Sequence, residues 1–307
     1  MSKIGIIDIG SNTFNLLISC VTTKKSIFRC EDFVGIRKGT IDGFIQEKTI
    51  SDSIKLINKY KNKCKKLDCK KIYLVATASL REPKNNLEFL DRCKKKTGLI
   101  INIISGIEEA KLIFHGISNN IHNLNNYLIV DIGGASTEFV ICKYKKAIYK
   151  KSFSFGSQLL LQKFKPTSPI NSQDLFKINS FFKKKLKNLL LVVKKYKIIN
   201  LIGSSGSINC LANIQSLNAK AEKLDYLNIE QFTQITSPKI LNSTIEDRKK
   251  IPGLVKMRAE NIIITIILIN FLIDEGIKNV YTSKFSLNDG IFSNILNNTI
   301  SWQESLL

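Results

Sequence analysis

Short apolar runs and amphipathic segments alternate along the chain. Runs of strand length predict strands at 4–8, 14–21, 71–77, 99–104, 127–131, 138–144, 198–202 and 280–283. Segments whose apolar residues return every three or four positions predict helices at 50–67, 87–98, 107–117, 172–196, 258–273 and 287–297. Strands and helices that alternate in this way are typical of α/β domains.

The most apolar stretch, 262–273, is interpreted as a buried core helix. A helix that spans a bilayer takes about 20 apolar residues, and this run is shorter and contains Thr265 and Asn270. The N-terminal segment 4–20 includes Asp8 and other polar residues, so it lacks the continuous apolar core of a signal peptide. We therefore expect a cytoplasmic protein that does not bind membranes.

One strand–turn–strand motif occurs twice. In each copy a strand ends in an acid and runs into a turn of small residues. The copies are Asp8-Ile9-Gly10-Ser11-Asn12-Thr13 and Asp131-Ile132-Gly133-Gly134-Ala135-Ser136-Thr137. An internal duplication of this kind predicts two related α/β domains that face one another. We expect them at 1–120, with a closing C-terminal helix of about 290–307 packed on it, and at 121–289.

Both turns have the composition of phosphate-binding loops. Glycine lets main-chain N–H groups approach a phosphate closely, and serine and threonine add hydroxyl donors. The acid at the strand end suits Mg²⁺, which prefers carboxylate and phosphate oxygens. A single turn of this type is more often a plain hairpin. Two copies with an acid at the same place favour the functional interpretation.

The chain is strongly basic. Its 307 residues include 47 Lys and Arg against 25 Asp and Glu, a formal charge of +22. Such a field attracts polyanions. Abundant Lys, Asn and Ile indicate instead a compositional bias, and lysines such as those in 183–187 fit a solvated helix face. Both interpretations stay open, with the compositional one favoured, and no aromatic pattern indicates a specific nucleic-acid partner.

Cysteine usage indicates a reducing compartment. The seven cysteines are unevenly spaced, and no Cys-x-x-Cys pair occurs. This pattern argues against a zinc site and against a disulfide-stapled secreted scaffold.

Four segments together resemble the exopolyphosphatase and guanosine pentaphosphate phosphohydrolase (Ppx/GppA) family. They occur in the family's order and spacing, at 7–14, 76–81, 104–110 and 131–138, with a weaker match at 201–207. The resemblance covers roughly residues 4–300 and is to the short, two-domain form. It implies an α/β fold of two duplicated RNase H-like domains of the actin-like ATPase superfamily, the superfamily of sugar kinases, heat-shock chaperones and actin, with a cleft between the domains.

The resemblance also implies roles for individual residues. Glu109 matches the general base that activates the attacking water, and the adjacent Glu108 is the more structural acid. Arg81 matches an arginine that clamps phosphate. The acids placed about a divalent metal, Mg²⁺ or Mn²⁺, are Asp8, Asp131 and Glu138. The phosphate-binding residues are Gly10, Ser11, Asn12, Thr13, Gly133, Gly134, Ala135, Ser136, Thr137, Gly203, Ser204, Ser205 and Gly206.

Plainer alternatives exist for these residues, and two segments depart from the family's pattern. Glu109 also fits a helix N-terminal acid stabilised by the helix dipole, and Arg81 also fits a surface ion pair with Glu82 or another acid. Ala135 stands where a third glycine is usual, and its methyl group disfavours positive φ. Segment 283–290 reads Ser-Lys-Phe-Ser-Leu-Asn-Asp-Gly where the family has Ser-Asp-Gly…Arg-Glu-Gly.

The sequence therefore predicts a phosphohydrolase that removes terminal orthophosphate from inorganic polyphosphate. The alternative substrate is guanosine pentaphosphate (pppGpp), which is cleaved at its 5′-phosphate in the stringent response. Two further hypotheses are an ATP-dependent kinase of the same superfamily and a non-catalytic sensor of alarmone or polyphosphate. Retention of Glu109 argues against the sensor, and homodimer formation is left open.

Overall fold

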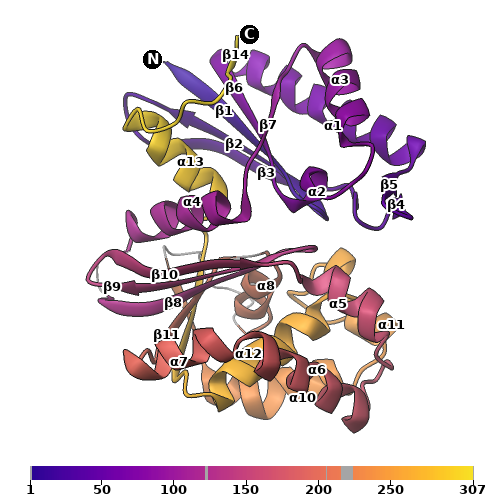
Figure 1. The fold of residues 1–307 in the computed structure, drawn as a ribbon, viewed down its shortest axis with the longest axis vertical. Helices are drawn as coiled ribbons and strands as arrows, with labels where there is room; N and C mark the ends of the chain where they lie inside the picture. Colours follow the sequence, from indigo (N-terminus) through magenta and orange to yellow (C-terminus); the bar gives the residue numbers. More distant parts are fainter. Residues whose placement is uncertain (1, 122–123, 205, 216–223, 307) are drawn as a thin grey trace. The chain divides into compact units, whose positions relative to one another are not determined.

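The computed structural model (Figure 1) describes residues 2–121, 124–204, 206–215 and 224–306. Contacts divide the chain into two compact units. The first comprises Met1–Gly116, Gly133–Ala135 and Leu287–Leu307, and the second comprises Ile117–Ile132 and Ser136–Ser286. Each unit has its own sheet and its own buried core.

The first unit is built on a six-stranded sheet. An antiparallel meander of β1 (Lys3–Ile9), β2 (Thr13–Cys20) and β3 (Ser26–Phe33) is extended by β6 (Cys69–Ala76), which lies parallel to β1. Two short strands also pair with β6: β7 (Ile101–Ile103) and the C-terminal β14 (Ser305–Leu306). The C-terminal strand therefore completes the N-terminal sheet.

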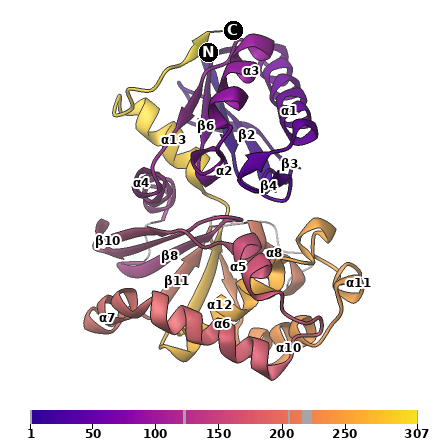
Figure 2. The same ribbon diagram turned by 45° about the vertical axis from the view of Figure 1, so that its right-hand side comes forward.

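Helices cover both faces of this sheet (Figures 1 and 2). α1 (Glu47–Lys66) and α3 (Asn86–Thr97) lie on one face, and α13 (Leu287–Leu296) lies on the other. α13 also packs on α4 (Gly106–Ser118), so closely that a Cβ at Gly290 would lie 1.8 Å from the carbonyl oxygen of Leu112. The remaining elements of the unit are α2 (Ala78–Arg81) and the ribbon of β4 (Thr40–Ile41) and β5 (Phe44–Ile45).

The second unit repeats this plan with another six-stranded sheet. β8 (Asn126–Ile132), β9 (Thr137–Lys143) and β10 (Lys146–Phe153) form an antiparallel meander. β11 (Asn200–Gly203) lies parallel to β8, β13 (Asn279–Ser283) lies parallel to β11, and β12 (Leu224–Leu227) closes the edge antiparallel to β13. Both units thus share a meander followed by a parallel strand beside its first strand, so the fold class expected from the duplicated motif is confirmed.

Helix α12 (Ile262–Asp274) lies in the core of the second unit and is buried on nearly all sides, as its apolar sequence predicts. It contacts α5 (Ser157–Phe164), α6 (Ser172–Lys185), α8 (Gly206–Gln215) and α10 (Ser237–Leu241). The unit also contains α7 (Lys187–Lys195), α9 (Ile229–Gln231) and α11 (Ile245–Arg248). A π-helical turn, Phe232–Thr236, joins α9 to α10, and a 3₁₀ turn, Lys256–Arg258, precedes α12.

Several predicted elements differ from the structure. The single helix expected at 172–196 is wrong, because Leu186 leaves helical geometry (φ −94°, ψ 5°) and separates α6 from α7. The helix expected from 258 begins only at Ile262. Strands β3 and β10 were not predicted, because they are largely exposed edge strands without an apolar run. No described helix is long and apolar enough to cross a membrane, and all seven cysteines are free thiols.

Candidate functional site

The first hairpin, β1–β2, pairs Asp8 directly with Asn15 across the strands. The Asn15 side-chain amide donates to Asp8 Oδ2 over 3.2 Å. Between the strands the Gly10 amide donates to the Thr13 carbonyl over 3.1 Å, and a Cβ at Gly10 would lie only 2.7 Å from that oxygen. The tight turn therefore requires glycine at this position.

The loop after β3 is hydrogen-bonded to this turn. The amides of Val34 and Gly35 donate to the Asn12 carbonyl over 3.0 and 2.9 Å, and the Arg37 amide donates to the Ser11 carbonyl over 3.0 Å. These bonds occupy the two carbonyls that face the loop. Ser11 itself is buried.

Helix α2 places Arg81 near the end of β1. Within α2 the Ser79 hydroxyl donates to the carbonyl of Ile9, the last residue of β1. The Arg81 guanidinium donates from Nη1 to the Ile104 carbonyl over 2.6 Å, and the same nitrogen lies 3.7 Å from Glu109 Oε2. The partner considered for Arg81 in the sequence, Glu82, pairs with Arg37 instead.

Glu109 lies in the first turn of α4, as predicted, and is 7% exposed. Its amide donates to the Ser105 carbonyl over 2.9 Å. The neighbouring Glu108 has a different environment, because its Oε1 accepts a hydrogen bond from Trp302 Nε1 over 3.1 Å. Glu108 thus ties α4 to the C-terminal segment, while Glu109 meets Arg81.

The second hairpin, β8–β9, pairs Asp131 directly with Glu138. Residues paired in this way have side chains on one face with Cβ atoms about 4.5–5.5 Å apart. The Ser204 hydroxyl donates to Asp131 Oδ2 over 2.6 Å, and the Ser152 hydroxyl donates to Glu138 Oε1 over 2.7 Å. Glu138 is only 2% exposed.

Burial raises the pKa of the Asp131 carboxyl, and the hydrogen bond from Ser204 opposes this shift in part. Desolvation disfavours the charged form of a carboxyl, whereas a donated hydrogen bond favours it. A bound cation would favour the ionised form further.

The other predicted phosphate-binding residues of the second unit have mixed environments. Thr137 is fully buried, and its hydroxyl donates to the Phe155 carbonyl over 2.6 Å, which is a structural contact. Ser136 is buried beside it. At the third turn a Cβ on Gly203 would clash with the Ile208 side chain, and one on Gly206 would lie 2.2 Å from Arg258 Nη2. Ser205 lies outside the described residues.

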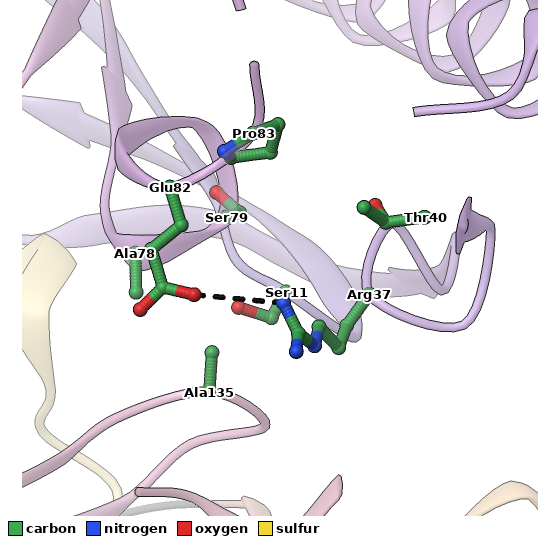
Figure 3. Close-up of a pocket in the computed structure, with 8 residues that line it drawn as sticks. All are labelled: Ser11, Arg37, Thr40, Ala78, Ser79, Glu82, Pro83 and Ala135. Atoms are coloured by element: carbon green, nitrogen blue, oxygen red, sulfur yellow. Dashed lines mark ion pairs between the residues drawn. The ribbon is translucent and has the colours of Figure 1, made fainter. Parts of the chain in front are cut away.

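The turn residues Gly133–Ala135 belong to the first compact unit, although the strands on either side of them belong to the second. Ala135 is buried and lines a small pocket with Ser11, Ser79 and Arg37 (Figure 3). It is not among the described residues with positive φ, so its methyl group fits the turn without left-handed strain.

Among the described residues, no group of three or more His, Cys, Asp or Glu side chains is placed to hold a metal ion. Asp131 and Glu138 form a pair of oxygen donors on one face of the second sheet. Mg²⁺ commonly takes one or two carboxylates and completes its shell with water and substrate phosphate. The pair therefore fits a Mg²⁺ ion that is held jointly with substrate. The placement of Asp8, Asp131 and Glu138 about one metal ion stays a prediction.

The sequence profile of the Ppx/GppA phosphatase family matches residues 9–299. The chain belongs to this family. The match includes every candidate site residue except Asp8, which immediately precedes it.

Named relatives and solved structures agree with this Ppx/GppA assignment. A Haemophilus influenzae protein named for exopolyphosphatase activity is 26% identical over 274 residues, 84% of this chain and 83% of that protein. A guanosine-5′-triphosphate,3′-diphosphate pyrophosphatase of Pseudoalteromonas translucida is 27% identical over 252 residues, 81% of this chain but only 50% of that protein.

The crystal structure of an exopolyphosphatase from Cytophaga hutchinsonii has a TM-score of 0.91 at 27% identity, covering 97% of this chain and 99% of that one. The Aquifex aeolicus Ppx/GppA family member has a TM-score of 0.80 at 22% identity, covering 98% of this chain and 99% of that one, and this likeness supports the fold alone. The chain has the α/β fold of this family, built from two compact units.

Sequence reasoning missed three residues of the site. Asn15 holds Asp8, and the shared spacing of the two hairpins was a usable signal, because Asn15 occupies the place of Glu138. Ser152 lies on an unpredicted edge strand. Arg37 lies outside the duplicated motif, and no sequence pattern marked it.

Proposed function

We propose that this Ppx/GppA family hydrolase releases terminal orthophosphate from inorganic polyphosphate by attack of a water molecule on the last phosphorus. The observation that carries the proposal is the pairing of Arg81 with Glu109, 3.7 Å apart, next to the first glycine turn. The Arg81 guanidinium would then bind the same terminal phosphate that water attacks with the help of the buried Glu109 carboxylate.

Glu109 is the proposed general base. A carboxylate close to the reacting phosphorus accepts a proton from water as the water oxygen attacks. The new P–O bond forms while the anhydride P–O bond breaks, and the shortened polyphosphate leaves as an oxyanion. The low exposure of Glu109, 7%, limits competition from bulk water for its oxygen atoms.

Arg81 and the first turn are proposed to hold the terminal phosphate. A guanidinium donates two parallel hydrogen bonds to phosphate oxygens and offsets the charge that builds up during transfer. Gly10 keeps the turn tight, and Ser11 and Thr13 supply hydroxyl groups. Arg81 donates to the Ile104 carbonyl and lies beside Glu109.

Asp131 and Glu138 are proposed to hold Mg²⁺ or Mn²⁺. A bound divalent cation neutralises phosphate charge and orients the anhydride for in-line attack. Ser204 and Ser152 fix the two carboxylates, so their oxygens are oriented before a cation arrives. Asp8, held by Asn15, is proposed to act through the metal or through an ordered water.

Hydrolysis of pppGpp at its 5′-phosphate is the second candidate. It is favoured by the similarity to the Pseudoalteromonas pyrophosphatase, of which this chain spans about half. Both substrates end in the same phosphoanhydride, so the chemistry derived for the site serves either one.

Phosphate release from a substrate panel tests the proposal. The purified chain is incubated with polyphosphates of several lengths and with pppGpp, with Mg²⁺ or with EDTA. We expect release from polyphosphate that stops in EDTA. Release from pppGpp alone would favour the second candidate. Binding without release from any substrate would favour a sensor, and ADP formation from ATP with a sugar or an acid would favour a kinase.

A further inference from the structure

The loop after β3 brings an arginine to the first turn. Arg37 donates its amide to the Ser11 carbonyl over 3.0 Å, so its backbone is fixed beside a predicted phosphate-binding residue. Its side chain lines a small pocket with Ser11 and Ser79, and Figure 3 shows the guanidinium and the Glu82 carboxylate directed toward one another beside Ser11. The pocket belongs to the first unit.

The guanidinium of Arg37 is incompletely satisfied within the described residues. Nη1 lies 3.5 Å from Glu82 Oε2, longer than a good charge-assisted hydrogen bond, which is about 2.7–2.9 Å. Nε is buried and has no hydrogen-bond partner among the residues described. A buried donor without a partner costs free energy, so a ligand that supplies an acceptor there is favoured.

We propose that Arg37 is a second phosphate-binding arginine, which donates to a phosphate oxygen of the substrate held by the first turn. This inference rests on the proposed function and adds a residue that no motif assigned. Arginine suits the role because its planar guanidinium presents several donors to a phosphate at once. Glu82 holds the side chain near Ser11 until phosphate replaces it as the stronger partner.

A purely structural role would have the Arg37–Glu82 pair hold the loop to α2. The two accounts predict different effects of removing Glu82 on phosphate binding. If the pair is structural, removal of either partner breaks the same contact and has the same effect on phosphate binding. If Arg37 binds phosphate, loss of Arg37 weakens binding, whereas loss of Glu82 removes a competitor and leaves binding equal or tighter.

Titration calorimetry with tripolyphosphate in EDTA tests this without turnover, on the full chain and on Arg37→Gln, Arg37→Lys and Glu82→Gln. We expect Arg37→Gln to raise the Kd at least about tenfold, the scale of one charge-assisted hydrogen bond, with a flatter salt dependence. Arg37→Lys recovers part of the loss, and Glu82→Gln leaves the Kd unchanged or lower.

Circular dichroism and thermal melts confirm that each variant is folded. An unchanged Kd in a folded Arg37→Gln, an equal rise in Arg37→Gln and Glu82→Gln, or no binding by the parent would overturn the assignment. A parent that binds tripolyphosphate through Arg37 but releases no phosphate with Mg²⁺ would contradict the proposed hydrolysis while leaving this inference in place.

Discussion

The two hairpins share topology, register and an acid near the end of the first strand, but the residue that faces this acid differs. Asp8 faces Asn15 in the first hairpin, and Asp131 faces Glu138 in the second. The first carboxylate accepts from an amide side chain, while the second belongs to a pair of acids, each fixed by a serine.

The difference indicates that the two copies of the duplicated motif have different roles. Two ionised acids opposite each other repel, and either a bound cation or protonation of one acid relieves the repulsion. We propose that the second hairpin uses a cation and is the metal-binding element. The first hairpin has one acid and instead adjoins the arginine and glutamate that we propose act on water and phosphate.

Among the changes that compare the two hairpins, the largest expected effect concerns the metal. Glu138→Gln keeps the shape of the side chain and removes its charge, so we expect the Mg²⁺ concentration for half-maximal phosphate release to rise about 10- to 100-fold. Asn15→Ala at the matching position of the first hairpin should change it less than about threefold. Equal shifts in the two variants would mean that the hairpins do not differ in metal binding.

The two turns should also differ in how much a substitution between glycine and alanine lowers the free energy of unfolding. Gly10→Ala places a Cβ 2.7 Å from the Thr13 carbonyl oxygen, and we expect a loss of roughly 1–3 kcal/mol in the free energy of unfolding. Ala135→Gly in the second turn should cost less than about 1 kcal/mol, because the change acts mainly on the unfolded chain. Urea denaturation measures both, and a well-tolerated Gly10→Ala would contradict the tight-turn account.

A single substitution gives the first hairpin the acid pair of the second. Asn15→Glu places an acid opposite Asp8, and like charges directly opposite each other in a sheet destabilise by up to about 1 kcal/mol. We expect the Tm to fall in EDTA and to recover with Mg²⁺. A loss that Mg²⁺ does not reverse would show that an acid pair alone is not sufficient to bind the ion.

The smallest effect concerns pH. Burial raises the pKa of folded Asp131, so the folded state binds more protons than the unfolded state, and the contribution of Asp131 to stability falls as pH rises from about 3.8 through the raised value. Without metal, Asp131→Asn should therefore raise the Tm at neutral pH, by on the order of 1–2 °C. The gain should vanish near pH 3, and a gain that persists there would have another cause.

Much of the fold was predictable because its core strands, such as β1, β6, β8 and β11, are largely apolar runs of strand length. Gly98 ends α3 in the left-handed conformation that glycine favours (φ 70°), at the C-terminal end of the helix predicted at 87–98. Edge strands such as β3 escaped prediction, because one exposed face leaves them with polar residues and no apolar run. The break between α6 and α7 at Leu186 could not be predicted, because no glycine or proline lies there.

The candidate site was predictable only where a motif carries it. Glu109, Arg81 and the three hairpin acids, Asp8, Asp131 and Glu138, belong to short segments with a fixed order, whereas several of their partners come from distant parts of the chain. Ser152 reaches Glu138 through sheet register, and Trp302 reaches Glu108 across 194 positions. Such contacts depend on tertiary packing, which local sequence does not encode.

The most direct test of the account is the steady-state rate of phosphate release from polyphosphate by Glu109→Gln, with Glu108→Gln as the matched control one residue away. Loss of a general base typically lowers kcat by 10²–10⁴-fold. We predict a fall of at least about 100-fold for Glu109→Gln and less than about threefold for Glu108→Gln. Equal kcat values for Glu109→Gln and the parent would contradict the account.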